Sequence, residues 1–247
     1  MAAGGAGMIA SLLPQLPVAS IPGAIEFIFE PQPSNVTGGN LVGGFDQTLE
    51  LALTQLEVTI FALALSLVVA LPLGLYFGHR GTGELLAVGL GNAGRAIPEL
   101  ALIAFMAAWI GVGVGNLTIA LAVLGVPPIL TNTFVGIRQV ERAPVEAARG
   151  MGMTELAVLL RVELPLAIPT IMSGVRLAAI AIIGTATIAP LAGVLTLGDY
   201  IINSNVYGED GVLAGAIVVA LMALALELML ALLQRRLTSK GLKLSPA

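Results

Sequence analysis

Two stretches of this chain are apolar over the length that a helix needs to cross a lipid bilayer. No charged residue lies from Val58 to Gly78, and none lies from Leu117 to Ile137. A helix crosses the hydrocarbon core with about 20 mostly apolar residues. Only 11% of the 247 residues are charged and 57% are hydrophobic, whereas soluble domains carry roughly a quarter charged residues. The sequence therefore predicts an all-α polytopic membrane protein.

Three further apolar segments complete a predicted set of about five transmembrane helices. The second helix is expected within residues 85–113, kinked or broken near Pro98. The fourth lies within residues 166–197 and the fifth within residues 212–233, with a polar loop at residues 198–211 between them. Residues 8–29 are also apolar but contain three prolines, which favours an interfacial or irregular segment over a spanning helix. A sixth span in that segment is the alternative.

The basic residues set the predicted orientation. Nine of the eleven lysines and arginines lie in residues 79–84, in residues 138–163 or after residue 234. Because loops rich in basic residues stay in the cytoplasm, we expect an external N-terminus and a cytoplasmic C-terminus. The predicted parts are an extracytoplasmic segment (1–48, with a loop at 31–48), a transmembrane domain (49–238, with a cytoplasmic loop at 138–165) and a cytoplasmic tail (239–247).

Residues 145–165 form the largest water-facing loop that the sequence predicts. Small side chains in its first part let a helix approach a partner closely, and Gly152 lets the backbone turn without a Cβ clash. Thr154 can cap a second short helix, and Pro165 favours the start of the next span. Two short helices that meet at a glycine make a compact knob, which suits insertion into a groove on another protein. The residues that define the pattern are Glu146, Ala147, Ala148, Gly152, Val162, Leu164 and Pro165.

This pattern resembles the signature of the membrane permeases of bacterial ABC importers, with Val162 where isoleucine is usual. The resemblance implies the type I importer permease fold, in a multi-pass protein of the bacterial cytoplasmic membrane. In such permeases this loop is the coupling helix, which docks into an ATPase subunit. The residues expected to carry that contact are Glu146, Ala147, Ala148, Gly150, Gly152, Leu164 and Pro165.

The resemblance also implies partners. Similar permeases work in pairs, so we expect a second copy or a paralogue, a dimer of cytoplasmic ABC ATPases and an extracytoplasmic solute-binding protein. This sequence has no Walker-type phosphate loop, so ATP and Mg²⁺ would be bound by the ATPase chains and no cofactor by this chain. The expectation is a transport subunit in the lipid bilayer, without a nucleic-acid partner and without enzymatic activity of its own.

A wider resemblance covers about residues 50–243 and extends to permeases for glycine betaine, choline, carnitine and related osmoprotectants. Two departures stand out, since Glu99 occupies a position where such permeases tend to have a small residue, and Leu195-Thr196 replaces what is often a glycine pair. The alternative is a permease of the same fold for amino acids or another small polar solute. The similar segments are residues 91–98, 131–137, 147–154, 184–187, 197–200 and 236–242.

Charged residues lie inside the predicted spans at Arg95, Glu99, Arg176 and Glu227. A charge at bilayer depth is costly and tends to face a cavity or a partner. Arg95 and Glu99 are four residues apart, so on a helix they share a face and can pair. Arg176 would pair with Glu99 or with Glu163. Arg95, Glu99 and Arg176 could line the translocation path, although we favour structural bracing for these charges.

Phe105 and Trp109 are candidate path residues of another kind. Quaternary ammonium solutes bind well in aromatic cages, and these two side chains lie four residues apart in the second predicted span. Aromatic residues make up only 4% of the chain, however. This low content is expected if the binding protein recognises the solute, so we favour ordinary packing or lipid contact for both rings.

Other functional classes lack the residues that they need. The chain has no cysteine and a single histidine, His79, which excludes thiolate chemistry and a metal site with several histidines. The three aspartates, Asp46, Asp199 and Asp210, fall in or beside predicted loops, so an intramembrane aspartyl protease is not supported. A passive channel or scaffold would have no use for the coupling-loop pattern.

Overall fold

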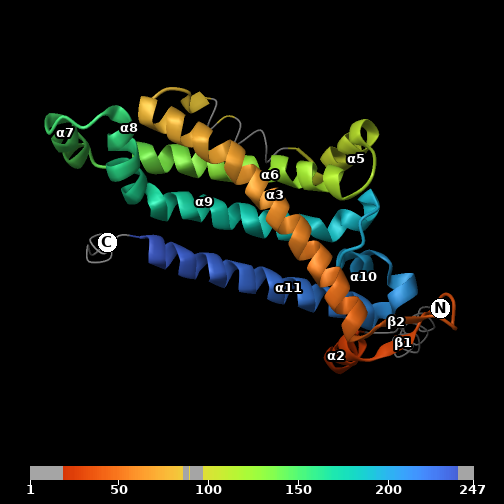
Figure 1. The fold of residues 1–247 in the computed structure, drawn as a ribbon. Helices are drawn as coiled ribbons and strands as arrows, with labels where there is room; N and C mark the ends of the chain where they lie inside the picture. Colours follow the sequence, from red (N-terminus) through yellow and green to blue (C-terminus); the bar gives the residue numbers. More distant parts are fainter. Residues whose placement is uncertain (1–18, 86–88, 90–96, 239–247) are drawn as a thin grey trace, which may run out of the picture.

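The computed structural model describes residues 19–85, 89 and 97–238, which form a bundle of long helices (Figure 1). The expected second span appears as the short apolar helix α5 (Glu99–Ile110), which begins directly after Pro98. Most of the predicted span ahead of Pro98 lies outside the described residues. Within the described residues, four stretches are long and apolar enough to cross a membrane: α3 (Gly44–Arg80), α6 (Val114–Arg138), the helical run Glu155–Ala192, and α11 (Ser204–Leu237).

The third of these stretches starts earlier than the sequence predicted. It joins α8 (Glu155–Val158), the π-helical turn η2 (Leu159–Glu163), α9 (Leu164–Thr185) and the 3-10 turn η3 (Ala186–Ala192). Pro165 lies in the first turn of α9, inside the run, whereas we expected the span to begin there. A proline cannot donate the backbone hydrogen bond that a continuing helix requires. The π turn η2 lies just before Pro165, and local π turns are one way in which membrane helices tolerate a proline.

The end of the bundle that lies away from α8 holds the N-terminal elements (Figure 1). They are α2 (Ile21–Phe29), the strands β1 (Pro31–Pro33) and β2 (Leu41–Gly43), and the later helix α10 (Gly198–Ile202). The Ser20 side chain caps α2 by accepting a hydrogen bond from the Gly23 N–H at 3.0 Å. Phe27 of α2 packs edge to face on Tyr200 of α10, with ring centroids 5.1 Å apart. These contacts fix α2 against the bundle end.

Two predicted loops are shorter than expected. Residues 31–48 were expected to lack regular structure, but β1 pairs antiparallel with β2, and α3 already begins at Gly44. Residues 198–211 hold α10 and the first turns of α11, in which Gly208 has a non-helical backbone (φ 68°). Polar and glycine-rich composition marked both segments as loops, because hydropathy alone does not show where a helix extends beyond the bilayer.

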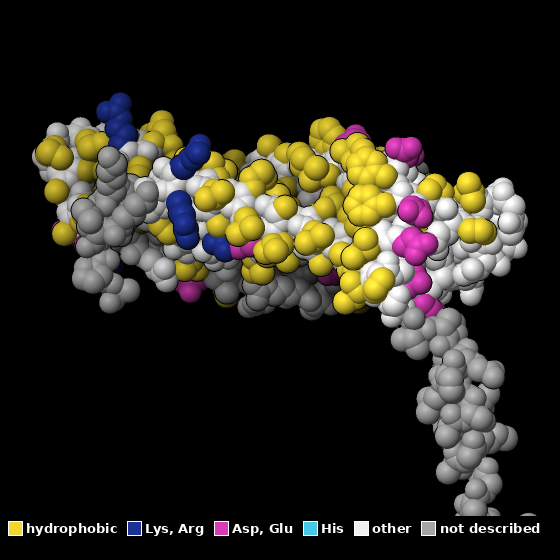
Figure 2. Space-filling view, turned by 90° about the horizontal axis from the view of Figure 1, so that it is seen from below, with side chains coloured by type: hydrophobic (Ala, Val, Ile, Leu, Met, Phe, Trp, Pro, Cys, Tyr) yellow, Lys and Arg dark blue, Asp and Glu magenta, His cyan; other side chains and the backbone are white. Residues whose placement is uncertain are grey.

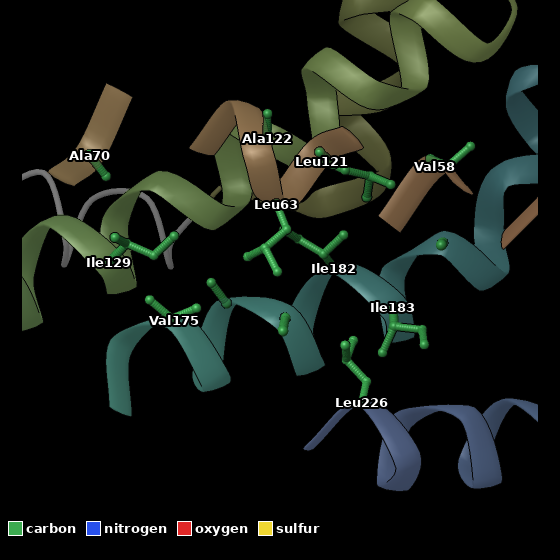
Figure 3. Packing of buried hydrophobic residues seen from close by; sticks show 14 of the residues in the cluster. Val58, Leu63, Ala70, Leu121, Ala122, Ile129, Val175, Ile182, Ile183 and Leu226 are labelled. Atoms are coloured by element: carbon green, nitrogen blue, oxygen red, sulfur yellow. The ribbon is translucent and has the colours of Figure 1, made fainter. Parts of the chain in front are cut away.

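The core lies where α6 packs between α3 and α9. Val58, Leu121 and Ile182 supply fully buried side chains from the three helices, and Leu226 of α11 reaches the same cluster (Figure 3). In contrast, only 11% of the most apolar window of α11 is buried inside the chain. Most of the α11 surface therefore faces lipid or another subunit.

Charge is divided between the two ends of the bundle. Figure 2 shows arginine side chains toward one end and most of the visible acidic side chains toward the other. The basic end, as we name it, holds α7 (Arg142–Gly150), α8 and the described arginines Arg80, Arg138, Arg142, Arg149, Arg161, Arg235 and Arg236. The acidic end holds Glu26, Glu30, Asp46, Glu50, Asp199, Glu209 and Asp210, and no lysine or arginine among the residues described there.

Candidate functional site

The predicted coupling loop folds as two short helices at the basic end. The first is α7 (Arg142–Gly150), and α8 follows it directly after the turn at residues 151–154. Val145 and Ala148 of α7 are buried against Val158 in a small apolar cluster of their own. The remaining α7 side chains, including Glu146 and Ala147, are exposed. The loop is therefore a separate knob with its own core and an exposed outer face.

Gly152 makes the turn between the two helices, as predicted. Its φ is +82°, in the left-handed region that favours glycine, and its N–H donates to the Arg149 carbonyl at 2.9 Å. Thr154 then caps α8 by accepting from the Ala157 N–H at 3.4 Å, which confirms the predicted cap. No neighbouring atom lies within 4 Å of the position that a Gly152 Cβ would take, so the turn points into open space.

The knob is tied to the bundle by a chain of charged contacts that centres on His79, near the end of α3. His79 Nδ1 lies 2.6 Å from a Glu163 carboxylate oxygen, and His79 Nε2 lies 3.2 Å from a Glu155 oxygen. The Arg149 guanidinium donates to the same Glu155 oxygen at 2.8 Å. This hydrogen bond raises the pKa of Arg149 above its usual value. We call these four residues the His79 chain, which links α3, η2, α8 and α7.

Sequence reasoning did not find the His79 chain. It placed His79 at the end of a span and treated Glu163 as a partner for Arg176. The available signal was position, because the His79–Arg80 pair and residues 138–163 were both assigned to the cytoplasmic side. This assignment predicts that His79 and the charged residues of 138–163 lie at one end of the molecule. It does not predict which of them form pairs.

Loss of the His79–Glu163 contact should destabilise the protein, because the Glu163 carboxylate is only 8% exposed. We expect His79→Ala and Glu163→Gln each to lower the free energy of unfolding by about 1.5–3 kcal/mol. The double variant should cost little more than the worse single one, since both changes remove the same bond. Thermal unfolding in detergent measures all three. Arg80→Ala, which removes an exposed contact over the Tyr76 ring, is the neighbouring control, and additive losses at His79 and Glu163 would contradict the pairing.

Arg176, which lies inside a spanning helix, pairs with a different residue from the two that we predicted, Glu99 and Glu163. Arg176 of α9 donates to Glu227 of α11, with its Nε 2.7 Å from Glu227 Oε1, and also to Gln234 Oε1 at 3.0 Å. Neither Glu99 nor Glu163 pairs with it among the described residues. The expected pairing was wrong because the neighbour of α9 on this face is α11, which sequence distance does not reveal. The arrangement ties these two helices together.

Breaking this pair should be costly. In Glu227→Ala the Arg176 guanidinium would keep only Gln234, and we expect a loss of about 3 kcal/mol in the free energy of unfolding. The double variant Arg176→Met/Glu227→Leu should recover most of that loss, because it leaves no unpaired charge. The midpoint of thermal unfolding in detergent reports both. If the double variant is as unstable as Glu227→Ala, the unpaired charge of Arg176 is not the cause of the lost stability.

The other candidate path residues do not join Arg176 in one site. Glu99 accepts a hydrogen bond from Thr185 Oγ1 at 2.8 Å, while Arg95 lies outside the described residues. Phe105 and Trp109 lie near each other, with ring centroids 6.1 Å apart, but their exposed fractions are 56% and 77%. Both rings point away from the core of this chain.

Residues 70–239 match the family described as the binding-protein-dependent transport system inner membrane component. This chain belongs to that family. The match covers α6, the knob and α9, and extends from the second half of α3 to just past the end of α11. The protein is therefore a multi-pass membrane permease subunit, which confirms the predicted family and fold class.

Named relatives of this permease are more than a third identical to it over the aligned residues. The carnitine transport permease protein OpuCB of Listeria monocytogenes is 38% identical over 190 residues, which are 76% of this chain and 87% of that protein. The glycine betaine/carnitine/choline transport system permease protein OpuCB of Bacillus subtilis is also 38% identical over 190 residues, which are 76% of this chain and 88% of that protein. The osmoprotectant import permease protein OsmY of Salmonella typhimurium is 34% identical over 195 residues, 77% of this chain and 82% of its own length.

Solved structures support the permease fold. An inward-facing structure of the MetNI methionine ABC transporter superposes with a TM-score of 0.67 at 21% identity, over 78% of this permease and 96% of that chain. An amino acid ABC transporter crystallised with histidines gives a TM-score of 0.59 at 20% identity, over 76% of this permease and 93% of that chain. At this identity the likeness concerns the fold alone.

Proposed function

We propose that this permease is the membrane-spanning subunit of an ATP-driven importer for osmoprotectants with a quaternary ammonium group, such as glycine betaine, choline or carnitine. The observation that carries the proposal is the similarity to relatives named for these solutes, at 34–38% identity over about three quarters of the chain. The amino acid alternative has weaker support, because the structures named as a methionine transporter and as an amino acid transporter are only 20–21% identical to this permease.

The knob at the basic end is the proposed contact for the ATPase. Glu146, Ala147, Gly150 and Gly152 are exposed on its outer side and would meet the partner directly. Ala148 is buried, and Leu164 and Pro165 are half-buried behind the knob, so these three would position it. The His79 chain supports a mechanical role, since it joins the knob to α3 through charged contacts.

The remaining parts of the proposed assembly follow from the coupling arrangement. Two permease subunits, this chain twice or with a paralogue, would work with two cytoplasmic ATPase chains that bind ATP and Mg²⁺. An extracytoplasmic solute-binding protein would deliver the solute to the acidic end. The basic end, with the C-terminus, would face the cytoplasm, which agrees with the usual retention of basic residues on that side.

Co-purification from the native membrane in mild detergent tests this proposal. We expect an ATPase and a solute-binding protein to be recovered with the permease and identified by mass. The reconstituted complex should then take up a quaternary ammonium solute in the presence of ATP and Mg²⁺. Repeated recovery of the permease alone would contradict the importer assembly, and uptake of amino acids without quaternary ammonium solutes would transfer support to the alternative.

A further inference from the structure

A pocket on the side of the bundle is lined by Glu99, the first residue of α5. The pocket lies between the first turn of α5, the proline pair of α6 and the outer face of α9, and its volume is about 280 Å³. This volume is close to the lower end of the range for small-molecule pockets. We call it the Glu99 groove, and its walls include Glu99, Leu124, Pro127, Pro128, Leu177 and Ala181.

The groove has one charged group on a mostly apolar surface. Glu99 is exposed in the isolated subunit, and Thr185, which is buried, donates to one of its oxygens at 2.8 Å. This hydrogen bond orients the carboxylate. Among the described residues, none forms an ion pair with Glu99. Within the part of the chain that the structure describes, the groove therefore presents an oriented carboxylate that has no ion-pair partner and lies beside leucine and proline side chains.

The position of the Glu99 groove along the spanning helices indicates what the Glu99 carboxylate faces. Pro127 and Pro128 lie near the middle of α6, and Leu177 and Ala181 lie well inside α9. Each helix is part of a stretch that is long enough to cross the bilayer. A carboxylate at this depth is costly against lipid and tends to face a cavity or a partner. We therefore expect Glu99 to face a cavity or a partner subunit rather than the surrounding hydrocarbon.

We infer that the Glu99 groove receives the trimethylammonium group of the solute during its passage. The inference rests on the proposed function, and it names a site and a preference that the function leaves open. A trimethylammonium group has no N–H to donate, so it needs a nearby negative charge and apolar contact for its methyl groups. The groove provides both. A primary ammonium has three N–H donors to satisfy, and Glu99 and Thr185 offer it few acceptors.

The same charge predicts a preference within the solute class. Choline carries a net positive charge, whereas glycine betaine and carnitine also carry a carboxylate that Glu99 would repel. The permease should therefore pass choline more readily than a zwitterionic solute of similar size. Neutralising Glu99 should reduce or remove this difference, because it takes away both the attraction and the repulsion.

The first test compares uptake of choline and glycine betaine by the assembled transporter in proteoliposomes. Glu99→Gln should lower the choline-to-glycine-betaine uptake ratio by about fivefold or more, while Glu99→Asp should retain most of it. Glu50→Gln makes the same chemical change on an exposed residue of the acidic end and should leave the ratio unchanged. An equal loss for both solutes would assign Glu99 to structural bracing and overturn the inference. Failure of the unaltered transporter to take up either solute would instead overturn the proposed function.

The second test uses the absence of cysteine from this chain. A single cysteine at Ala181→Cys can be labelled with 2-(trimethylammonium)ethyl methanethiosulfonate or with neutral methyl methanethiosulfonate. Choline should protect this cysteine, and Glu99→Gln should lower the ratio of cationic to neutral labelling rates by about fivefold or more. Val36→Cys, in the turn between β1 and β2, should show neither effect. An unchanged ratio with no protection by choline would exclude the groove as a cation site.

Discussion

Gly152→Val should abolish most solute uptake while the permease still inserts in the membrane and the ATPase remains active. Gly152 has a φ of +82°, and a left-handed backbone costs an L-residue about 1–2 kcal/mol. A β-branched residue would pull the turn toward another conformation and misdirect α7. A bias of this size lowers the population of the native turn by about tenfold. Uptake and ATP hydrolysis are measured in parallel in proteoliposomes. The amount of solute taken up per ATP hydrolysed should fall.

The matched control is asparagine at the same position. Asparagine tolerates the left-handed region better than other residues with a side chain, so Gly152→Asn should keep most of the coupling. The space around the Gly152 Cβ position is open, so neither variant should disturb the packing of the bundle. Full uptake by Gly152→Val would show that the shape of this turn does not transmit the ATPase signal.

Gly198→Ala should be among the most destabilising single substitutions in this protein. A Cβ on Gly198 would overlap the carbonyl group of Thr187, which is backbone and cannot rotate away. The start of α10 would therefore have to separate from η3. We expect a loss of about 4–5 kcal/mol in the free energy of unfolding, the range reached only by severe steric changes. The yield of monodisperse protein and the midpoint of thermal unfolding in detergent measure the loss.

A second glycine provides the comparison for Gly198. Gly115 lies in the first turn of α6, and nothing lies within 4 Å of the position that its Cβ would take. Gly115→Ala should therefore leave the unfolding midpoint nearly unchanged. If Gly198→Ala and Gly115→Ala behave alike, the close approach of α10 to η3 does not support the fold.

The sequence predicted those parts of this permease that depend on local chemistry. The knob follows from a glycine at its turn and a threonine at its second helix start, and both Gly152 and Thr154 have those roles in the structure. The long helices follow from uninterrupted apolar residues, because a helix in lipid must satisfy its own backbone hydrogen bonds. Helix ends were less predictable, and α3 and α11 both extend into segments expected to be loops.

Partners across the bundle could not be predicted from sequence. Arg176 pairs with Glu227, and His79 pairs with Glu163, in each case across a large distance along the chain. The sequence offered Glu99 and Glu163 as partners for Arg176, and helix packing brought Glu227 to it instead. The likeness to known permeases supplied the family, but it did not supply these pairings or the groove beside Glu99.

The helix α9 has a mechanical consequence. At 1.5 Å per residue, its 22 residues form a rod roughly 33 Å long. The turn η2 joins one end of this rod to α8 of the knob, and η3, beside α10 at the acidic end, continues from the other end. A tilt of α9 by about five degrees about its knob end would move its far end by about 3 Å. Under the proposed function, a displacement of the knob would therefore reach the acidic end of the bundle through α9.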